Sequence, residues 1–326
     1  MERRQFVKEL AKGCGLLILP ISLEANAKSH KQALRFGVCA DVHKDIMYDA
    51  DSRINVFITE ASKRKLDFII QMGDFCRPYD TNREFLSIWN NYPGYKYHVI
   101  GNHDMDGGFT RERVIEFWES PAKYYSFVKN GFHFIVLDGN DKNPSSDKAP
   151  GYARFIGNEQ KEWLKNELRT ANSPCIIFSH QSFENADSGI ENQSEIRKLL
   201  EDENKAFGYK KIIACFSGHH HTDYATSING IYYIQINSMS YEWLGNQYQT
   251  IRYSNEIDEK FPWIKYTAPY REPLFAFVEI DSKSIRIEGR KSEFVGPTPV
   301  ELNYPKGPEN NPNVPFISDR NLSLKK

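Results

Sequence analysis

The chain has 326 residues, with 42 basic and 43 acidic side chains and a formal net charge of −1. This balance lacks the basic excess of a nucleic-acid-binding surface, so we expect no nucleic-acid partner. Hydrophobic residues make up 40% of the chain, and its length is enough for one large domain.

The N-terminal segment 1–27 predicts export. Residues 3–8 read RRQFVK, which resembles a bacterial twin-arginine signal. The apolar stretch 13–23 is too short to span a bilayer, and residues 25–27 read ANA, which fits a small-residue cleavage site. We therefore expect a signal peptide over 1–27 and a periplasmic or secreted mature protein without stable membrane insertion. The alternative is an ordinary amphipathic helix.

The elements predicted next along the chain alternate between strands and helices. Apolar runs predict strands over residues 35–40, 68–72, 97–100, 132–137, 176–178, 212–216, 231–236, 275–280 and 285–287. Helical patterns cover residues 52–64, 82–91, 158–170 and 191–203. This alternation indicates an α/β domain, which we place at residues 33–297.

Short polar clusters follow most of the early strands. They are Asp41-Val42-His43, Gly73-Asp74, Gly101-Asn102-His103-Asp104, Ser179-His180 and Gly218-His219-His220-His221. A buried sheet that presents carboxylate, imidazole and amide groups at its strand ends can hold metal ions on rigid elements. No cysteine lies at these positions, which argues against a cysteine-rich structural zinc site.

These residue types suit phosphoester hydrolysis. Two cations about 3.5–4 Å apart can generate a nucleophilic oxygen at neutral pH and stabilise charge on the phosphoryl oxygens. A carboxylate between the cations reduces their mutual repulsion. Aspartate, histidine and asparagine accept several first-row ions, so the sequence leaves manganese, iron and zinc open.

The ordered set resembles the calcineurin-like metallophosphoesterase superfamily. Its pattern is Asp-x-His, Gly-Asp, Gly-Asn-His-Asp/Glu, a lone His and Gly-His-x-His, and every part occurs in order over residues 37–221. The resemblance implies a four-layer αββα sandwich, in which two mixed β-sheets are flanked by helices. It also implies two divalent or trivalent metal ions.

The resemblance assigns a role to each residue by its position in the pattern. Asp74 would bridge the two ions, and His103 would contact the phosphoryl oxygen or the leaving group. The remaining ligands would be Asp41, His43 and His221 for one ion, and Asn102, His180 and His219 for the other.

One position departs from the pattern. Many relatives have an acidic residue, or the ligand tyrosine of purple acid phosphatases, three positions after the bridging aspartate, where this chain has Arg77. The Asp-x-His motif also differs from the Asp-x-Gly of purple acid phosphatases. The orientation of His103 therefore needs another partner. Asp104 is the nearest candidate in sequence, and Arg77 is a candidate contact for substrate phosphate.

The resulting hypothesis is a phosphohydrolase that cleaves a small phosphomonoester or phosphodiester with a metal-bridging hydroxide. The alternative is a catalytically silent binding protein that retains the fold. The complete ligand set favours the enzyme.

Three further features stay open at this stage. The segment 238–273 is rich in aromatic residues and forms either a rim over the metal site or a subdomain that buries its own rings. The segment 298–326 is rich in proline and asparagine, which predicts a poorly ordered tail. Buried thiols are expected, with a disulfide pair as the alternative, at Cys39, Cys76, Cys175 and Cys215.

Overall fold

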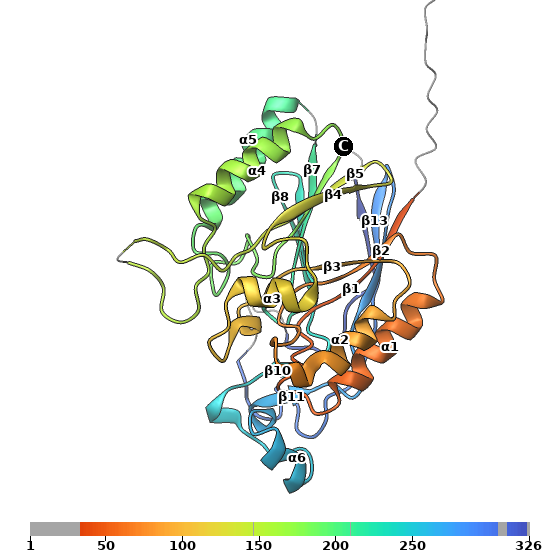
Figure 1. The fold of residues 1–326 in the computed structure, drawn as a ribbon, viewed down its shortest axis with the longest axis vertical. Helices are drawn as coiled ribbons and strands as arrows, with labels where there is room; N and C mark the ends of the chain where they lie inside the picture. The colour runs from red at the N-terminus through yellow and green to blue at the C-terminus, as the bar shows by residue number, and fades with distance from the viewer. Residues whose placement is uncertain (1–32, 146, 209, 306–311, 325–326) are drawn as a thin grey trace, which may run out of the picture. The chain divides into compact units, whose positions relative to one another are not determined.

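The computed structural model describes residues 33–145, 147–208, 210–305 and 312–324 (Figure 1). The predicted signal peptide at 1–27 lies outside the described residues. Within these ranges, no helix combines the length and the apolar character needed to cross a membrane.

The first sheet contains six strands in the order β14-β13-β12-β1-β2-β3. Its strands β1, β2 and β3 pair in parallel, and the other pairs are antiparallel. The bounds are β1 Leu34–Cys39, β2 Phe68–Gln71, β3 Tyr95–His98, β12 Ala276–Ile280, β13 Ser284–Glu288 and β14 Arg320–Ser323.

The second sheet also contains six strands, in the order β4-β5-β6-β7-β9-β8. The central strands pair in parallel, and β4 and β8 close the edges as antiparallel strands. The bounds are β4 Tyr125–Lys129, β5 Phe132–Val136, β6 Cys175–Phe178, β7 Ile212–Ser217, β8 Tyr224–Ile228 and β9 Ile231–Gln235.

Helices cover the outer faces of both sheets (Figure 1). Helices α1 (Ala50–Ser62), α2 (Arg83–Asn90) and α3 (Arg111–Trp118) pack with the first sheet. Helices α4 (Asn158–Thr170) and α5 (Gln193–Phe207) pack with the second. The predicted four-layer αββα sandwich of two mixed sheets is confirmed.

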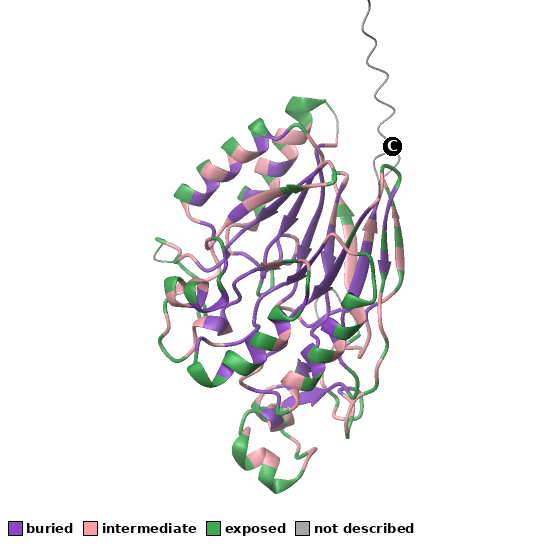
Figure 2. Ribbon diagram, turned by 45° about the vertical axis from the view of Figure 1, so that its right-hand side comes forward, coloured by how far each residue is buried: buried purple, intermediate pink, exposed green. Residues whose placement is uncertain are grey.

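Successive residues of β1 alternate between the core that lies between the two sheets and the face that α1 covers. In β1, Phe36 and Val38 face the second sheet, whereas Gly37 and Cys39 face α1. A Cβ atom at Gly37 would lie 3.1 Å from the ring of Phe57 in α1, so glycine lets the helix lie close to the strand. Figure 2 shows the buried strands of both sheets lying between the helical layers.

The segment 238–273 forms a small substructure next to this sandwich. It contains a two-stranded sheet of β10 (Tyr241–Trp243) and β11 (Thr267–Pro269), with α6 (Asn255–Lys260) between the two strands along the chain. Short 3₁₀ turns complete the structure at Asp80–Asn82, His103–Met105, Asn246–Tyr248 and Ile264–Tyr266.

The prediction of a poorly ordered tail at 298–326 is wrong for its described part. Strand β14 pairs with β13 and forms the edge of the first sheet, beyond the predicted domain end at residue 297. Ile317 is 2% exposed and belongs to the core between the sheets. Asn237 donates hydrogen bonds to the carbonyls of Val314 and Phe316. These contacts lie about 80 positions apart in sequence, so local composition could not reveal them.

The expectation of buried thiols is confirmed. The cysteines of the described part of the chain are free and buried. The four residues are Cys39, Cys76, Cys175 and Cys215.

Candidate metal centre

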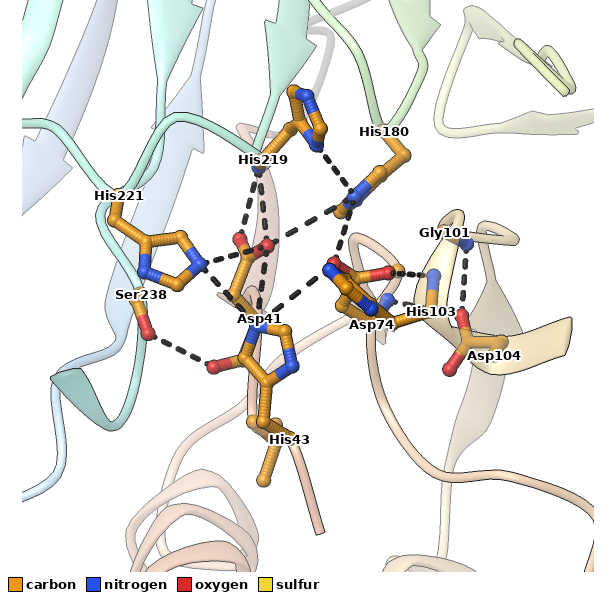
Figure 3. Close-up of polar contacts among 12 residues, drawn as sticks. Asp41, His43, Asp74, Gly101, His103, Asp104, His180, His219, His221 and Ser238 are labelled. Atoms are coloured by element: carbon orange, nitrogen blue, oxygen red, sulfur yellow. Dashed lines mark hydrogen bonds and ion pairs between the residues drawn. The ribbon is translucent and has the colours of Figure 1, made fainter. Parts of the chain in front are cut away.

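The loops that follow strands of both sheets bring the predicted ligands together. Six of the seven predicted ligands form two groups, and within each group the candidate ligand atoms lie within 4.8 Å of one another (Figure 3). One group is Asp41, His43 and His221, and the other is Asp74, His180 and His219. Motifs that are separated in the sequence therefore form two neighbouring groups of candidate metal ligands in the structure.

The first group joins a loop of each sheet. His43 Nε2 and His221 Nε2 lie 3.2 Å apart, and His221 Nε2 lies 3.4 Å from Asp41 Oδ1. Two nitrogens bonded to one ion at about 2.0–2.1 Å would lie about 2.9–3.4 Å apart. The His43–His221 spacing therefore fits two ligands of a single ion.

Asp74 lies between the two groups. Its Oδ2 atom is 3.3 Å from His180 Nε2 and 3.8 Å from His43 Nε2. Its Oδ1 atom accepts a hydrogen bond from the backbone N–H of His103 at 2.8 Å, which fixes the carboxylate. A single oxygen that faces ligands of both groups is the geometry expected of a bridging carboxylate.

The second group includes His180, whose ring orientation is fixed by a contact between its Nδ1 atom and the backbone. His180 Nδ1 lies 2.7 Å from the carbonyl oxygen of Met72, an acceptor, so Nδ1 carries a proton and Nε2 faces the other candidate ligands. That Nε2 atom lies 3.2 Å from His219 Nδ1. Although burial opposes it, the carboxylates of Asp74 and Asp41 raise the pKa of His180 to about 10. Burial lowers the pKa of His219 well below its usual value, as it does for His43, which favours the neutral imidazole that binds metals.

Asn102 is the seventh predicted ligand. It is 2% exposed, and its Oδ1 atom is buried with no hydrogen-bond partner among the described residues. A buried amide oxygen without a hydrogen-bond partner is unfavourable unless another group binds it. A metal ion would satisfy this oxygen, so the donors present fit the metals implied by the sequence.

The ligand loops hold their backbone in an unusual conformation. Five predicted ligands have positive φ angles between 51° and 69°, namely Asp41, His43, Asp74, His219 and His221. A residue with a side chain in this left-handed region is uncommon, and such strain of about 1–3 kcal/mol each persists where the surroundings enforce it. Its concentration at one place marks a site that the fold pre-organises.

Close approach between loops explains two motif glycines. A Cβ atom at Gly101 would lie 2.2 Å from both the backbone nitrogen and Oδ1 of Asp74. One at Gly73, where φ is +97°, would lie 2.5 Å from His180 Nδ1. Both positions require glycine because any side chain there would displace a predicted ligand.

Two serines that the motifs do not include hold the first ligand loop. Ser238 Oγ donates to the carbonyl of Asp41, and Ser240 Oγ donates to the carbonyl of Val42. They begin the aromatic-rich segment, so this segment supports the metal loop directly. No sequence pattern predicts these contacts, because serine occurs in too many roles.

His103 lies beside the metal groups and is oriented by Asp106. Its Nδ1 atom lies 2.8 Å from Asp106 Oδ2, to which Arg77 Nη2 also donates at 3.1 Å. Tyr152 OH donates to Asp106 Oδ1 at 2.9 Å and lies 3.1 Å from His103 Nδ1. Although burial opposes it, the carboxylates of Asp74 and Asp106 raise the pKa of His103.

The expectation that Asp104 orients His103 is therefore wrong. Asp104 accepts hydrogen bonds from the backbone nitrogens of Asp74, Phe75 and Gly101, and so holds two motif loops together. Many relatives have an acidic residue at the position that Arg77 occupies here. In this chain Asp106 takes the place of that acid, and Arg77 is hydrogen-bonded to Asp106. The spacing of three residues between His103 and Asp106 was the available signal.

A comparison with family models now decides the class of the chain. The calcineurin-like phosphoesterase model matches residues 34–223, which include every predicted ligand and His103. The chain belongs to the calcineurin-like phosphoesterase family. No curated protein sequence matches the chain.

Solved structures support the same fold. A dimetal phosphatase from Danio rerio is 14% identical, with a TM-score of 0.58 over 80% of this chain and 98% of that one. GAP50, described as the anchor in the inner membrane complex of Plasmodium, is 16% identical, with a TM-score of 0.54 over 90% of each chain. At these identities the likeness concerns the fold.

A cavity of about 810 Å³ opens beside the candidate metal centre of this phosphoesterase. His43, Asp74 and His103 line its inner part, and the aromatic-rich segment lines its outer part with Trp243 and Trp263. Tyr241 connects the two, because its ring stacks on His43 with centroids 4.9 Å apart. The segment 238–273 thus has both expected characters: it buries Tyr241, and it forms a rim over the site.

Proposed function

We propose that this phosphoesterase hydrolyses a small phosphomonoester or phosphodiester with two metal ions. The observation that carries the proposal is Asp74 Oδ2, which faces histidines of both ligand groups beside His103 in one cavity. Asp41, His43 and His221 would hold one ion. Asn102, His180 and His219 would hold the other.

When bound, two such ions supply positive charge for the phosphoryl oxygens and a nucleophilic water at neutral pH. The chain supplies the remaining chemistry through His103. With Nδ1 directed to Asp106, the ring presents Nε2 as the nitrogen that can donate a proton to the leaving oxygen. Asp106 and Tyr152 fix the ring plane, so His103 loses little freedom on binding substrate.

A catalytically silent binding protein is the second candidate. The fold likeness to GAP50, whose description is that of an anchor, keeps this possibility open. The buried, unpartnered oxygen of Asn102 and the strained ligand loops favour the enzyme, because a scaffold has no need to retain either.

Turnover by reconstituted protein separates the two candidates. The chain would be stripped with a chelator, reloaded separately with manganese, iron or zinc, and assayed on 4-nitrophenyl monoesters and diesters. We expect turnover that chelation removes and at least one metal restores. Full loading with metal but no turnover of either ester would favour the silent protein.

We also propose that residues 1–27 direct export by the twin-arginine route. The proposal rests on the RRQFVK sequence and the ANA site, which lie outside the described residues. Replacing both Arg3 and Arg4 by lysine should block export while keeping the charge, because a receptor reads the arginine pair. Exported protein that still begins at Met1, rather than near Lys28, would reject the cleavage.

A further inference from the structure

Two residues that line the cavity have a buried oxygen atom with no hydrogen-bond partner among the described residues. Glu242 lines the cavity and is 6% exposed, and its Oε2 atom is buried with no hydrogen-bond partner among the described residues. Asn313 lines the same cavity, and its Oδ1 atom is also buried and unpartnered in the described part of the chain. Both atoms are hydrogen-bond acceptors when Glu242 is ionised.

The strand pairing holds Glu242 in this wall. It lies at the centre of β10, opposite Ala268 of β11, so the carboxyl group is carried by paired backbone rather than by a free loop. Burial raises the pKa of Glu242 well above its usual range, and no positive side chain contributes to this shift. A buried carboxylate without a counter-charge is unfavourable, so burial favours the neutral form of Glu242, and a cationic ligand would stabilise the ionised form.

Aromatic rings line the same cavity. Trp243 and Trp263 are 40% and 53% exposed, and both line it together with Tyr304. Tyr304 OH donates to the backbone carbonyl of Trp243 at 3.0 Å, which holds these two walls together. Indole and phenol faces attract cations within about 6 Å.

The carboxyl group of Glu242 favours a cation over a neutral base. Trp243 and Trp263 each pack against Tyr266, with centroids 6.1 and 5.6 Å away. A flat heterocycle could stack on an indole ring without using the carboxyl group, whereas an ammonium group can meet an aromatic face and a carboxylate together.

We propose that Glu242, Asn313 and the rings of Trp243, Trp263 and Tyr304 bind a protonated amine on the organic group of the phosphoester. This inference rests on the proposed hydrolysis, with the phosphate at the metal centre and the amine at the rim. The preferred substrates are then aminoalkyl phosphoesters, in which the N–H groups donate to Glu242 and Asn313.

Non-hydrolysable ligands test the inference apart from turnover. A series of ω-aminoalkyl phosphonates of increasing chain length would be titrated calorimetrically into metal-loaded protein. Each would be compared with the n-alkyl phosphonate of equal length, which replaces the ammonium group by a methyl group. We expect at least one chain length to bind about 10–100-fold more tightly with the amine, the range for a hydrogen bond to a charged group.

Glu242→Gln should reduce this preference to about 3-fold or less, because a neutral amide loses the charge interaction. Glu256→Gln is the matched control, since it removes the same charge from an exposed position in α6 of the same segment and should keep the preference. The wild-type comparison needs no variant, so a poorly folding Glu242→Gln protein leaves the inference testable.

The outcomes separate the two proposals. Turnover of alkyl phosphoesters with equal binding of amine and alkyl ligands would overturn the amine site and leave the hydrolase intact. An amine preference in binding without turnover of any ester would overturn the hydrolase and support the site. Failure of every phosphonate to bind would overturn the amine site, and the turnover assay would still decide the hydrolase.

Discussion

The loops of the predicted ligands and the region from residue 238 onward meet at one cavity, yet they are specified in different ways. The loops place their groups through short motifs at strand ends, where five predicted ligands take positive φ angles. The region from residue 238 onward contributes Tyr241, Trp243 and Glu242 through packing against distant segments. The candidate metal ligands are therefore specified by local sequence motifs, whereas the residues that line the outer part of the cavity are placed by contacts between distant segments.

Asp74→Asn should have the largest effect, because it weakens both ion sites at once. We expect turnover to fall by more than about 10⁴-fold, beyond the usual range for one acid–base group. Asn102→Asp, which alters one site only, should lose less. Metal analysis should find ion loss in the Asp74 variant. Equal, mild losses with unchanged metal content in both variants would rule out the bridging role.

His103→Ala should keep both ions and lower turnover by about 10²–10⁴-fold. The loss should be smaller for esters with good leaving groups, since these need no proton from His103. Rates for a series of substituted phenyl esters check this dependence. A missing ion in this variant would instead make His103 a ligand.

Ile317→Ala tests whether the tail belongs to the core. The side chain is 2% exposed between the sheets, so we expect the free energy of unfolding to fall by about 2–5 kcal/mol. Val300→Ala, at a residue 79% exposed in the same region, should change it by less than about 0.5 kcal/mol. Urea denaturation measures both. Equal stabilities would mean that the tail does not contribute to the core.

Asp106→Asn should have a moderate effect, because it disturbs the orientation of His103 without removing it. We expect a 10–10²-fold loss in turnover, the scale of a misplaced reacting group. The leaving-group dependence should resemble that of His103→Ala, and the double variant should be no worse than His103→Ala alone. Additive losses in the double variant would show that Asp106 acts independently of His103.

Trp243→Ala should have the smallest effect and should be selective. Ring contacts contribute about 0.5–1.5 kcal/mol beyond area burial, so KM for an aryl phosphoester should rise about 2–10-fold. A small alkyl phosphate should be unaffected. Ile251→Ala is the control, at a residue 63% exposed in the same segment that does not line the cavity. A loss of stability with both KM values unchanged would make the segment a packing unit only.

The sequence predicted much of the fold and most of the site for one physical reason. Strands of the interior are apolar runs, and the parallel arrangement puts their ends, with Asp41, Asp74 and His180, at neighbouring places. Each of these patterns lies within one short stretch of the sequence. They also predicted the helices near α1, α2, α4 and α5 to within a few residues.

The remaining features depend on contacts between distant segments. Tyr152 lies in a polar loop whose composition gives no indication that it reaches Asp106. Ser238 is held to Asp41 across almost two hundred positions, and β14 is a short strand recognisable only beside β13. The error at Asp104 has a similar origin, because adjacency in sequence does not decide which carboxylate the His103 ring faces.

Anomalous diffraction from crystals of the metal-loaded protein tests the central claim most directly. It locates each ion without reference to activity. The account predicts two peaks about 3.5–4 Å apart, with a carboxylate oxygen of Asp74 between them and Asn102 Oδ1 bound to one. A single peak, or two peaks that Asp74 does not bridge, would contradict it.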